Sequence, residues 1–295
     1  MRALDAARVL VAATVALCAL SGPGRAQAPT GAWDLVVLGI AQDGGIPQLG
    51  CDRPLCQEVR AGKRKAEKVS CLGLVDRRTG DAYLFDATPD LPAQLQALTG
   101  GRAPNGVFLT HAHIGHYTGL MFFGRESVNA SNVPVYVTGR MAAFLRSNGP
   151  WSQLVAIRNI TLTTIAYDQP VALRGGVRVT PFQVPHRDEF SDTVGFRIEG
   201  PRKTAIFIPD IDRWEKWDRN VRTLADAADY AFVDGTFASP AEINRPIEEI
   251  PHPLMGRTRE LLRGARAAIW FIHINNSNAE IDGPDVAKEG MTFPI

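Results

Sequence analysis

The stretch Phe108-Leu-Thr-His-Ala-His-Ile-Gly-His116 decides the fold of this chain, and it holds three of the six histidines. It continues from a short apolar run, Gly106–Leu109, which is typical of a buried strand. Histidine is neutral and able to bind a metal near pH 7, because its ordinary pKa is about 6.5. Three histidines at the end of a strand therefore predict a divalent metal site. The alternative is a histidine-rich loop with ordinary hydrogen-bonding roles.

The motif Thr110-His-Ala-His-Ile-Gly-His116 resembles the metallo-β-lactamase superfamily signature Thr-His-x-His-x-Asp-His. Three later residues, His186, Asp210 and His273, each follow an apolar segment that is typical of a strand. They come in the order in which that superfamily places its third metal histidine, its bridging aspartate and its last metal histidine. A single polar residue after a predicted strand is weak evidence for this resemblance. All three residues in the expected order, after the histidine motif, are strong evidence for it.

This resemblance implies a specific set of metal ligands. The first metal site would consist of His111, His113 and His186. The second would keep His116 and His273, with Asp210 available to both sites. The cofactor expected from these ligands is one or two divalent metal ions, zinc first, with iron or manganese as alternatives.

One position departs from the superfamily signature. Gly115 stands where the superfamily has an aspartate that binds the second metal, so a single metal or a modified second site is expected. Asp43, in the loop Gln42-Asp-Gly-Gly45 after the first predicted strand, is a candidate substitute ligand. Glycines let the backbone approach a metal closely. The alternative, which the residues favour slightly, is that Asp43 only forms a turn.

Three further segments resemble pyrroloquinoline quinone biosynthesis protein B and its relatives within the superfamily. They are Leu38–Gly45, Phe232–Phe237 and Ile272–Asn278. The superfamily resemblance implies an α+β fold, a four-layer αβ/βα sandwich in which two mixed sheets face each other beneath outer helices. The pattern of segments alone predicts only an α/β or an α+β fold.

The beginning of the chain has the form of a secretory signal peptide, residues 1–28. Arg2 and Arg8 precede an uncharged, mostly apolar run of twelve residues, Val9–Leu20, and Ala26-Gln-Ala28 resembles a cleavage site. The run is shorter than the roughly 20 residues that a membrane-spanning helix needs. The sequence therefore predicts a periplasmic or secreted protein with no membrane span after cleavage, and an uncleaved anchor is the alternative.

Composition indicates one ordinary globular domain over residues 29–295. Hydrophobic residues make up 45% of the chain and charged residues 21%, and no repeat or low-complexity linker divides it. Cleavage after residue 28 removes three arginines and one aspartate, which changes the net charge from +1 to −1. No basic excess remains for nucleic acid, so a small-molecule substrate is the expected partner. The sequence does not decide the oligomeric state.

Three cysteines, Cys51, Cys56 and Cys71, remain beyond the predicted signal peptide. In an oxidising compartment Cys51 and Cys56 are expected to form a disulfide. A structural zinc is an alternative because some relatives bind one in this region, and free thiols are another. Cys71 begins a predicted strand and is expected to be a small buried residue.

Strand and helix patterns alternate along the chain. Strands are predicted at 34–40, 70–76, 83–86, 107–110, 133–138, 230–234 and 267–274, with a β-rich region over 160–209 and a turn at Gly175-Gly176. Helices are predicted at 91–98, 141–147 and 254–263, with another that begins in 117–123 and a long one over Asp212–Ala227 capped by Asp212.

A metal held by three histidines keeps an open position for water and lowers the pKa of that water to about 7. This chemistry predicts hydrolysis of an ester, lactone, amide or phosphodiester. Asp210 is the catalytic candidate, which would orient the water or bridge two metals. Asp234, His252 and Asn275 are candidates for supporting a ligand or contacting the substrate, against strand capping or surface roles.

Two other functions remain open at this point. The resemblance to the quinone biosynthesis protein implies an iron-dependent oxidative enzyme as one alternative, since histidine and carboxylate also suit Fe(II). The predicted export argues against the cytoplasmic quinone pathway. A non-catalytic binding protein that keeps the fold is the other alternative, which Gly115 favours slightly and the retained histidines oppose. Hydrolysis of β-lactams is a less favoured case of the hydrolase prediction.

Overall fold

The computed structural model describes residues 33–243, 246 and 249–295. The predicted signal peptide lies outside these residues and stays a prediction. Within the described part of the chain, no helix has both the length and the apolar character needed to cross a membrane.

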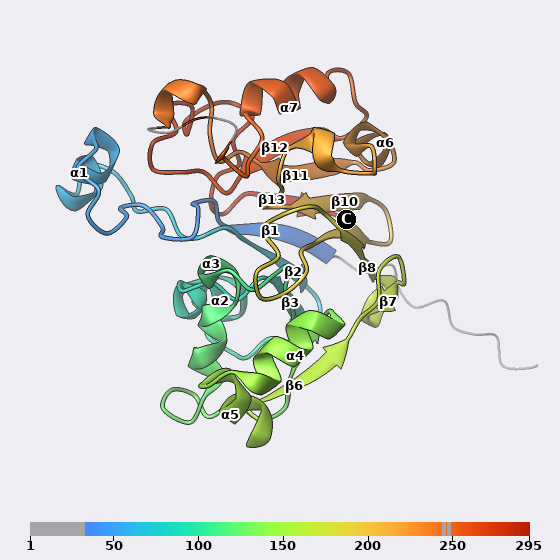
Figure 1. Ribbon diagram of the computed structural model, residues 1–295. Helices are drawn as coiled ribbons and strands as arrows, with labels where there is room; N and C mark the ends of the chain where they lie inside the picture. Colours follow the sequence, from blue (N-terminus) through green and yellow to red (C-terminus); the bar gives the residue numbers. More distant parts are fainter. Residues whose placement is uncertain (1–32, 244–245, 247–248) are drawn as a thin grey trace, which may run out of the picture.

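Two mixed β-sheets pack face to face, and helices cover their outer sides (Figure 1). The seven-stranded sheet has the spatial order β13-β1-β2-β3-β4-β5-β6. Its strands are β1 (Trp33–Gly39), β2 (Cys71–Asp76), β3 (Ala82–Phe85), β4 (Gly106–Phe108), β5 (Val133–Val137), β6 (Ile160–Thr164) and β13 (Thr292–Pro294). The six-stranded sheet has the order β12-β11-β10-β9-β8-β7. Its strands are β7 (Val171–Ala172), β8 (Arg178–Gln183), β9 (Val194–Glu199), β10 (Thr204–Ile208), β11 (Tyr230–Asp234) and β12 (Ala268–Ile272).

Strand direction decides where the polar residues after each strand meet. In the first sheet β3 and β4 are parallel, and β1 runs with them because both β1 and β3 are antiparallel to β2. In the second sheet β10, β11 and β12 are parallel, and β8 runs with them because both β8 and β10 are antiparallel to β9. Within each sheet, the segments that follow these strands therefore emerge at one edge.

The helices are short and lie outside the sheets. They are α1 (Pro54–Arg60), α2 (Leu91–Thr99), α3 (Ile114–Tyr117), α4 (Gly139–Ser147), α5 (Trp151–Ala156), α6 (Val221–Asp226) and α7 (Met255–Leu261). Figure 1 shows α2, α4 and α5 on the side of the first sheet and α6 and α7 on the side of the second. The predicted four-layer α+β sandwich is confirmed.

An aromatic cluster between the sheets holds the strand that precedes the histidine motif. Phe108, the last residue of β4, is fully buried and stacks on Tyr136 and Phe85 at ring-centre distances of 4.3 and 5.4 Å. Phe196 of the opposite sheet meets Phe108 edge-on at 5.7 Å. Each such aromatic pair contributes about 0.5–1.5 kcal/mol beyond the burial of its surface. The start of the histidine motif is thus rigidly placed by the core.

Most predicted elements are confirmed, with ends that differ by one or two residues. The long helix predicted over Asp212–Ala227 is wrong. The chain forms a 3-10 turn at Trp214–Lys216 and then the short helix α6, whose first turn is capped by the side chain of Asn220 rather than Asp212. The packing of Trp214 and Trp217 explains the difference, since both side chains are largely buried. The ring N–H of Trp214 donates to Thr258 Oγ1 at 2.8 Å, and that of Trp217 donates to the carbonyl of Gln183 at 2.9 Å.

Other differences are smaller. The helix predicted to begin in 117–123 begins earlier, at Ile114, and continues as a 3-10 helix over Thr118–Phe123. Helices α1 and α5 and strand β13 were not predicted. The predicted turn at Gly175-Gly176 is confirmed, and both glycines have positive φ, 67° and 82°.

Of the disulfide, structural zinc and free thiols considered for Cys51 and Cys56, the structure has the disulfide. Cys51 and Cys56 form a disulfide that joins helix α1 to the loop before it. Cys71 is free and fully buried at the start of β2, as predicted, and burial raises the pKa of its thiol well above the ordinary value.

Candidate metal centre

All six histidines of the chain gather at one edge of the sandwich. His111 and His113 lie in the loop after β4, and His116 lies in helix α3. The other three come from the second half of the chain and follow β8, precede α7 or follow β12; they are His186, His252 and His273. Five of the six are buried, and His113 is partly buried. Such a concentration of imidazoles in a protein interior indicates a metal site.

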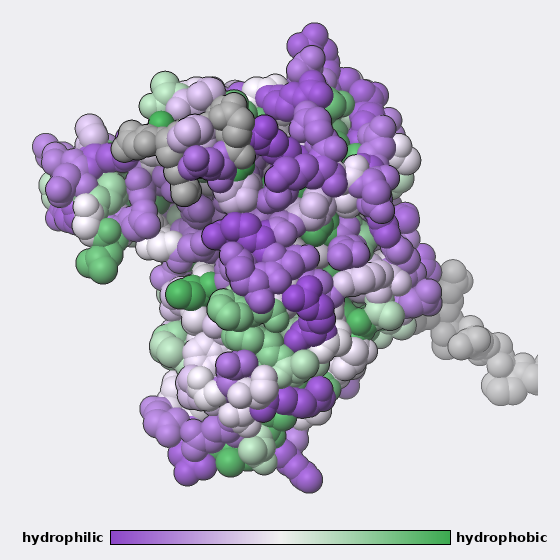
Figure 2. Space-filling model, viewed as in Figure 1, coloured by the Kyte–Doolittle hydropathy of each residue, from purple (hydrophilic) through white to green (hydrophobic). Residues whose placement is uncertain are grey.

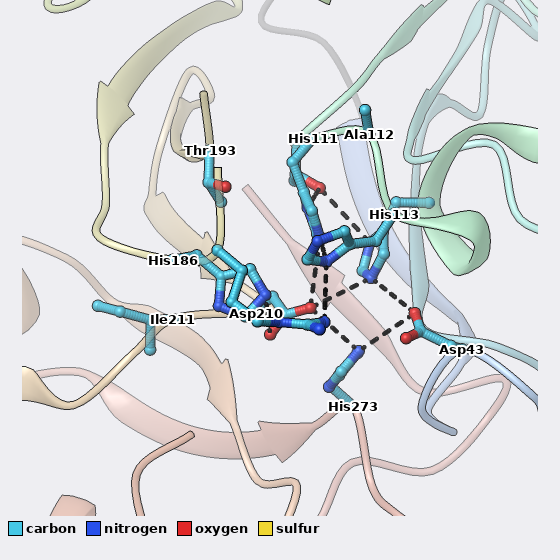
Figure 3. Close-up of polar contacts among 12 residues, drawn as sticks. Asp43, His111, Ala112, His113, His186, Thr193, Asp210, Ile211 and His273 are labelled. Atoms are coloured by element: carbon cyan, nitrogen blue, oxygen red, sulfur yellow. Dashed lines mark hydrogen bonds and ion pairs between the residues drawn. The ribbon is translucent and has the colours of Figure 1, made fainter. Parts of the chain in front are cut away.

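Asp210, two residues after the end of β10, lies at the centre of this group (Figure 3). One carboxylate oxygen, Oδ2, is 3.5 Å from Nε2 of each of three histidines: His111, His116 and His273. The other oxygen, Oδ1, is 3.3 Å from His186 Nε2 and 3.2 Å from His252 Nδ1. Asp210 therefore lies between two neighbouring sets of histidines, and its predicted role as a shared metal ligand stays a prediction.

Three groups of donor atoms could each hold a metal ion, with all atoms of a group within 4.8 Å of one another. The first contains His111, His113, His186 and Asp210. The second contains Asp43, His116 and His273, and the third contains Asp210, Asp234, His252 and His273. The first matches the ligand set predicted for the first metal site, and the second joins Asp43 to the histidines predicted for the second site.

Several of these donor atoms are buried without a hydrogen-bond partner in the described part of the chain. They are Asp43 Oδ1, His116 Nε2, His186 Nε2, Asp210 Oδ1 and His273 Nε2. A buried polar atom that lacks a partner costs about 1–3 kcal/mol, so proteins rarely leave one, and here five belong to the first two donor groups. A divalent metal ion satisfies this kind of donor set, so the residues present fit one.

Asp86 orients the histidine motif, a role that the sequence reading missed. It is fully buried directly after β3 and accepts hydrogen bonds from the Thr110 backbone N–H at 2.8 Å and the Thr110 hydroxyl at 2.9 Å. His116 Nδ1 lies 2.7 Å from the same carboxylate, so Nδ1 carries the proton and Nε2 is left to bind a metal. The available signal was an aspartate at the end of a buried strand, the same signal that identified Asp210.

Glu189 holds the ring of His113 in one orientation. Its carboxylate lies 2.9 Å from His113 Nε2, so Nδ1 of this ring faces the site, 2.8 Å from His111 Nε2. Glu189 ends the charged run Arg187-Asp-Glu189 that follows His186. In the structure Glu189 is bound to a histidine, and Asp188 accepts from the Thr193 hydroxyl at 3.0 Å.

Asp234 and His252 form a buried pair beside the first metal group. His252 Nδ1 lies 2.8 Å from Asp234, whose other oxygen accepts from the backbone N–H and hydroxyl of Thr236 at 2.9 and 2.7 Å. The Thr236 hydroxyl also lies 3.0 Å from His273 Nδ1, so Asp234 reaches that predicted ligand through Thr236. Both sequence-predicted candidates are thus in the site, while Thr236 was missed.

Asn275 makes no hydrogen bond to a histidine ring in the described part of the chain. Its backbone N–H donates to the carbonyl of Thr236 at 3.2 Å, and its side chain is bonded to Gln42 and Ser277. It lines the pocket next to Asp43. A role in shaping the pocket fits these contacts better than direct support of a metal ligand.

The charges around the site favour neutral His111 and ionised Asp210. Burial lowers the pKa of His111 well below its ordinary value. Burial acts to raise the pKa of Asp210, but the imidazoles of His186 and His273 outweigh it and hold that pKa well below the ordinary value. The site thus holds a neutral imidazole and a carboxylate, the forms that bind a metal.

Two other histidines have raised pKa values. Burial acts to lower the pKa of His116, but Asp86, Asp210 and Asp43 outweigh it and hold the pKa well above its ordinary value. Burial also opposes the charge on His252, yet Asp234 and Asp210 raise its pKa to about 9. Both shifts reflect the carboxylates that surround these rings.

Two backbone positions at the site are strained. Asp86 and His273 have positive φ values of 72° and 61°, which side chains other than glycine rarely adopt. Such conformations cost about 1–3 kcal/mol each and persist where surrounding contacts enforce them, most often at functional sites.

An open pocket of about 350 Å³ adjoins the histidines, and its walls are mainly polar. Asp43, Arg187 and His252 are among the residues that line it. In the view of Figure 2, hydrophilic residues cover most of the surface that the C-terminal half of the chain forms. Apolar residues lie lower in this view, around α3 and α4. Exposed apolar side chains there include Ile114 of α3, and Phe190, which contacts Phe144 of α4. The site therefore has a polar pocket on one side and apolar side chains beside His113 and Glu189.

Comparisons with known proteins agree with this geometry. Coenzyme PQQ synthesis protein B of Nitrosococcus oceani is 28% identical over 86% of this chain and 97% of its own length. The protein of the same name from Methylobacillus flagellatus is 30% identical over 82% of this chain and 89% of its own length.

Solved structures show the same fold. Zn²⁺-bound PqqB from Methylobacterium extorquens superposes with a TM-score of 0.75 at 23% identity, covering 89% of this chain and 100% of that one. A diphosphatase from the PhnP family superposes with a TM-score of 0.67 at 19% identity, covering 89% and 97%. The family model described as "Beta-lactamase superfamily domain" matches residues 82–274, which include the histidine motif and every later residue of the centre. The chain therefore belongs to the metallo-β-lactamase superfamily and is a relative of coenzyme PQQ synthesis protein B.

Proposed function

We propose that this protein is a metal-dependent hydrolase that acts on a small molecule with an ester, lactone, amide or phosphodiester bond. The observation that carries the proposal is the convergence of buried, unpaired donor atoms on Asp210 beside an open pocket. A purely structural histidine cluster would satisfy these atoms with hydrogen bonds. The membership of the metallo-β-lactamase superfamily and the fold shared with a zinc-bound relative support the same conclusion.

The residues of the chain have separate tasks in this proposal. A divalent metal, when bound, supplies a Lewis acid and lowers the pKa of water to about 7. His111, His113 and His186 hold it, and Glu189 keeps the ring of His113 turned toward the site. Asp210 stays ionised, so it orients the attacking water by accepting a hydrogen bond from it.

His252 is the proposed proton donor to the leaving group. It lines the pocket, and its Nδ1–H is held by Asp234 at 2.8 Å, which leaves Nε2 as the ring nitrogen able to serve a substrate. Asp234 is itself fixed by Thr236 and by the backbone N–H of Ile211 at 3.2 Å. The pair therefore presents an oriented imidazole at the pocket wall.

Replacing His252 with glutamine is expected to slow hydrolysis in proportion to the basicity of the leaving group. A general acid contributes typically about 10²–10⁴-fold, and it contributes most where the leaving group is a strong base. The measurement is kcat/KM of wild type and His252→Gln for a series of aryl and alkyl esters or phosphodiesters. An equal loss for all leaving groups would contradict proton donation and leave His252 a structural role.

The proposed function is tested by metal analysis of mature protein purified without added metal, followed by a substrate screen. Wild type is expected to contain at least one zinc per chain, and His113→Ala to lose metal and hydrolysis together. Asp218→Ala, which changes an exposed acid outside the site, serves as the control. Iron with no hydrolysis would instead favour oxidative chemistry, and a folded protein that binds no metal would favour the binding-protein alternative.

A further inference from the structure

We propose that Asp43 supplies the carboxylate of the second metal site and fills the space that Gly115 leaves open. The proposal rests on the proposed metal centre, and it assigns a ligand from the loop after β1 in place of one from the histidine motif.

Gly115 is required for room rather than for backbone conformation. It lies within helix α3 and is not among the residues with positive φ. A Cβ atom at position 115 would come within 2.2 Å of Asp43 Oδ1 and 2.6 Å of Asp43 Cα, closer than any real contact. An aspartate at 115 and the present position of Asp43 therefore exclude each other.

The carboxylate of Asp43 faces the two histidines left for the second site. Oδ1 lies 3.3 Å from His116 Nε2 and 3.8 Å from His273 Nε2. Figure 3 shows the contact between Asp43 and His273 beside Asp210. All three atoms are buried and lack a hydrogen-bond partner among the described residues, although the Asp43 side chain as a whole remains 34% exposed. With the shared Asp210, they form a set of two imidazoles and two carboxylates, which suits zinc.

The contacts of the loop argue against the alternative that Asp43 only forms a turn. The turn is closed by the backbone, where the Gly45 N–H donates to the carbonyl of Gln42 at 2.8 Å. The Gln42 N–H in turn donates to the carbonyl of Ile274 at 2.9 Å, which ties the loop to the segment that carries His273. Because Asp43 Oδ1 stabilises no turn, its burial toward the histidines has another cause.

Zinc titration of metal-free protein tests the assignment, with sites counted by calorimetry and by the thermal shift at each equivalent. Wild type is expected to bind two equivalents. Asp43→Ala is expected to bind the first as wild type does and the second at least about tenfold more weakly. Asp43→Asn keeps the volume of the side chain and is expected to behave like Asp43→Ala, which separates loss of the charge from loss of packing. Asp52→Ala, an exposed acid nearby, is the matched control and is expected to bind like wild type.

Gly115→Ala examines the space directly. Its Cβ would meet both Oδ1 and the backbone Cα of Asp43, so this variant should be less stable than wild type and should bind the second equivalent more weakly. Two wild-type equivalents in both Asp43→Ala and Asp43→Asn would overturn the proposal. The proposal would also be overturned if wild type and all variants bound a single zinc equivalent with the same affinity. That result would leave the proposed function, a hydrolase with one metal, unaffected. Failure of wild type to bind zinc or any other divalent metal would instead remove the proposed function.

Discussion

Asp210→Ala is expected to abolish metal binding at both proposed sites and to reduce kcat/KM by about 10³-fold or more. The carboxylate of Asp210 lies within 3.5 Å of ring nitrogens of five histidines, and no other carboxylate among the described residues does so. Its loss would remove a shared ligand and leave several imidazoles without the negative charge that holds them together. Removing one partner of a buried charged group typically costs about 3–5 kcal/mol of stability.

The measurement combines elemental analysis, kcat/KM and urea unfolding of the metal-free proteins. Asp210→Asn preserves the shape of the side chain and one oxygen acceptor, so its unfolding free energy should lie between those of wild type and Asp210→Ala. Asp218→Ala is exposed and should match wild type in all three measurements. Wild-type metal content in Asp210→Ala would refute the central role assigned to this residue.

Asp86→Ala is expected to lower the free energy of unfolding by about 3–5 kcal/mol. The substitution leaves the buried N–H of Thr110 and Nδ1 of His116 without their acceptor. It also places alanine at a φ of 72°, a conformation that alanine tolerates less well than aspartate does. Because His116 would no longer be held in one orientation, affinity for the second metal should fall about 10–100-fold.

Asp86→Asn separates these effects. Asparagine tolerates positive φ and still offers Thr110 an oxygen, but it does not replace the negative charge beside His116. We therefore expect a smaller loss of stability than in Asp86→Ala. Asp76→Ala is the matched control, since Asp76 is also buried at a strand end but accepts from the N–H of Arg78 away from the site. Urea unfolding and zinc titration of the three variants test the prediction, and an equal effect of Asp76→Ala on zinc binding would contradict it.

The local sequence was sufficient to predict the main features of the centre. The spacing of the histidines in 110–116 and the order of His186, Asp210 and His273 after apolar segments point to one edge of a sandwich, where the structure brings them together. This works because the direction of each strand determines the edge at which the next residue emerges. Their role as metal ligands stays a prediction until metal is measured.

Local patterns misled where packing between distant segments decides the conformation. The segment from Asp212 to Ala227 has a helical pattern, yet Trp214 and Trp217 pack against other elements and interrupt it. The roles of Asp86 and Thr236 were missed for a related reason. Each acts by hydrogen bonding to a histidine 30 or 37 residues away, and no local pattern marks such a partner.

By itself, the sequence determined the four-layer fold, the histidine cluster and the absence of the motif aspartate at position 115. Only the tertiary structure decided what takes the place of that aspartate, because Asp43 and Gly115 lie on separate segments that meet through the order of the strands. A Cβ at position 115 would overlap Oδ1 and Cα of Asp43, so the present position of the Asp43 loop requires glycine at 115. That requirement is a property of atomic packing, which residue spacing along the chain does not express.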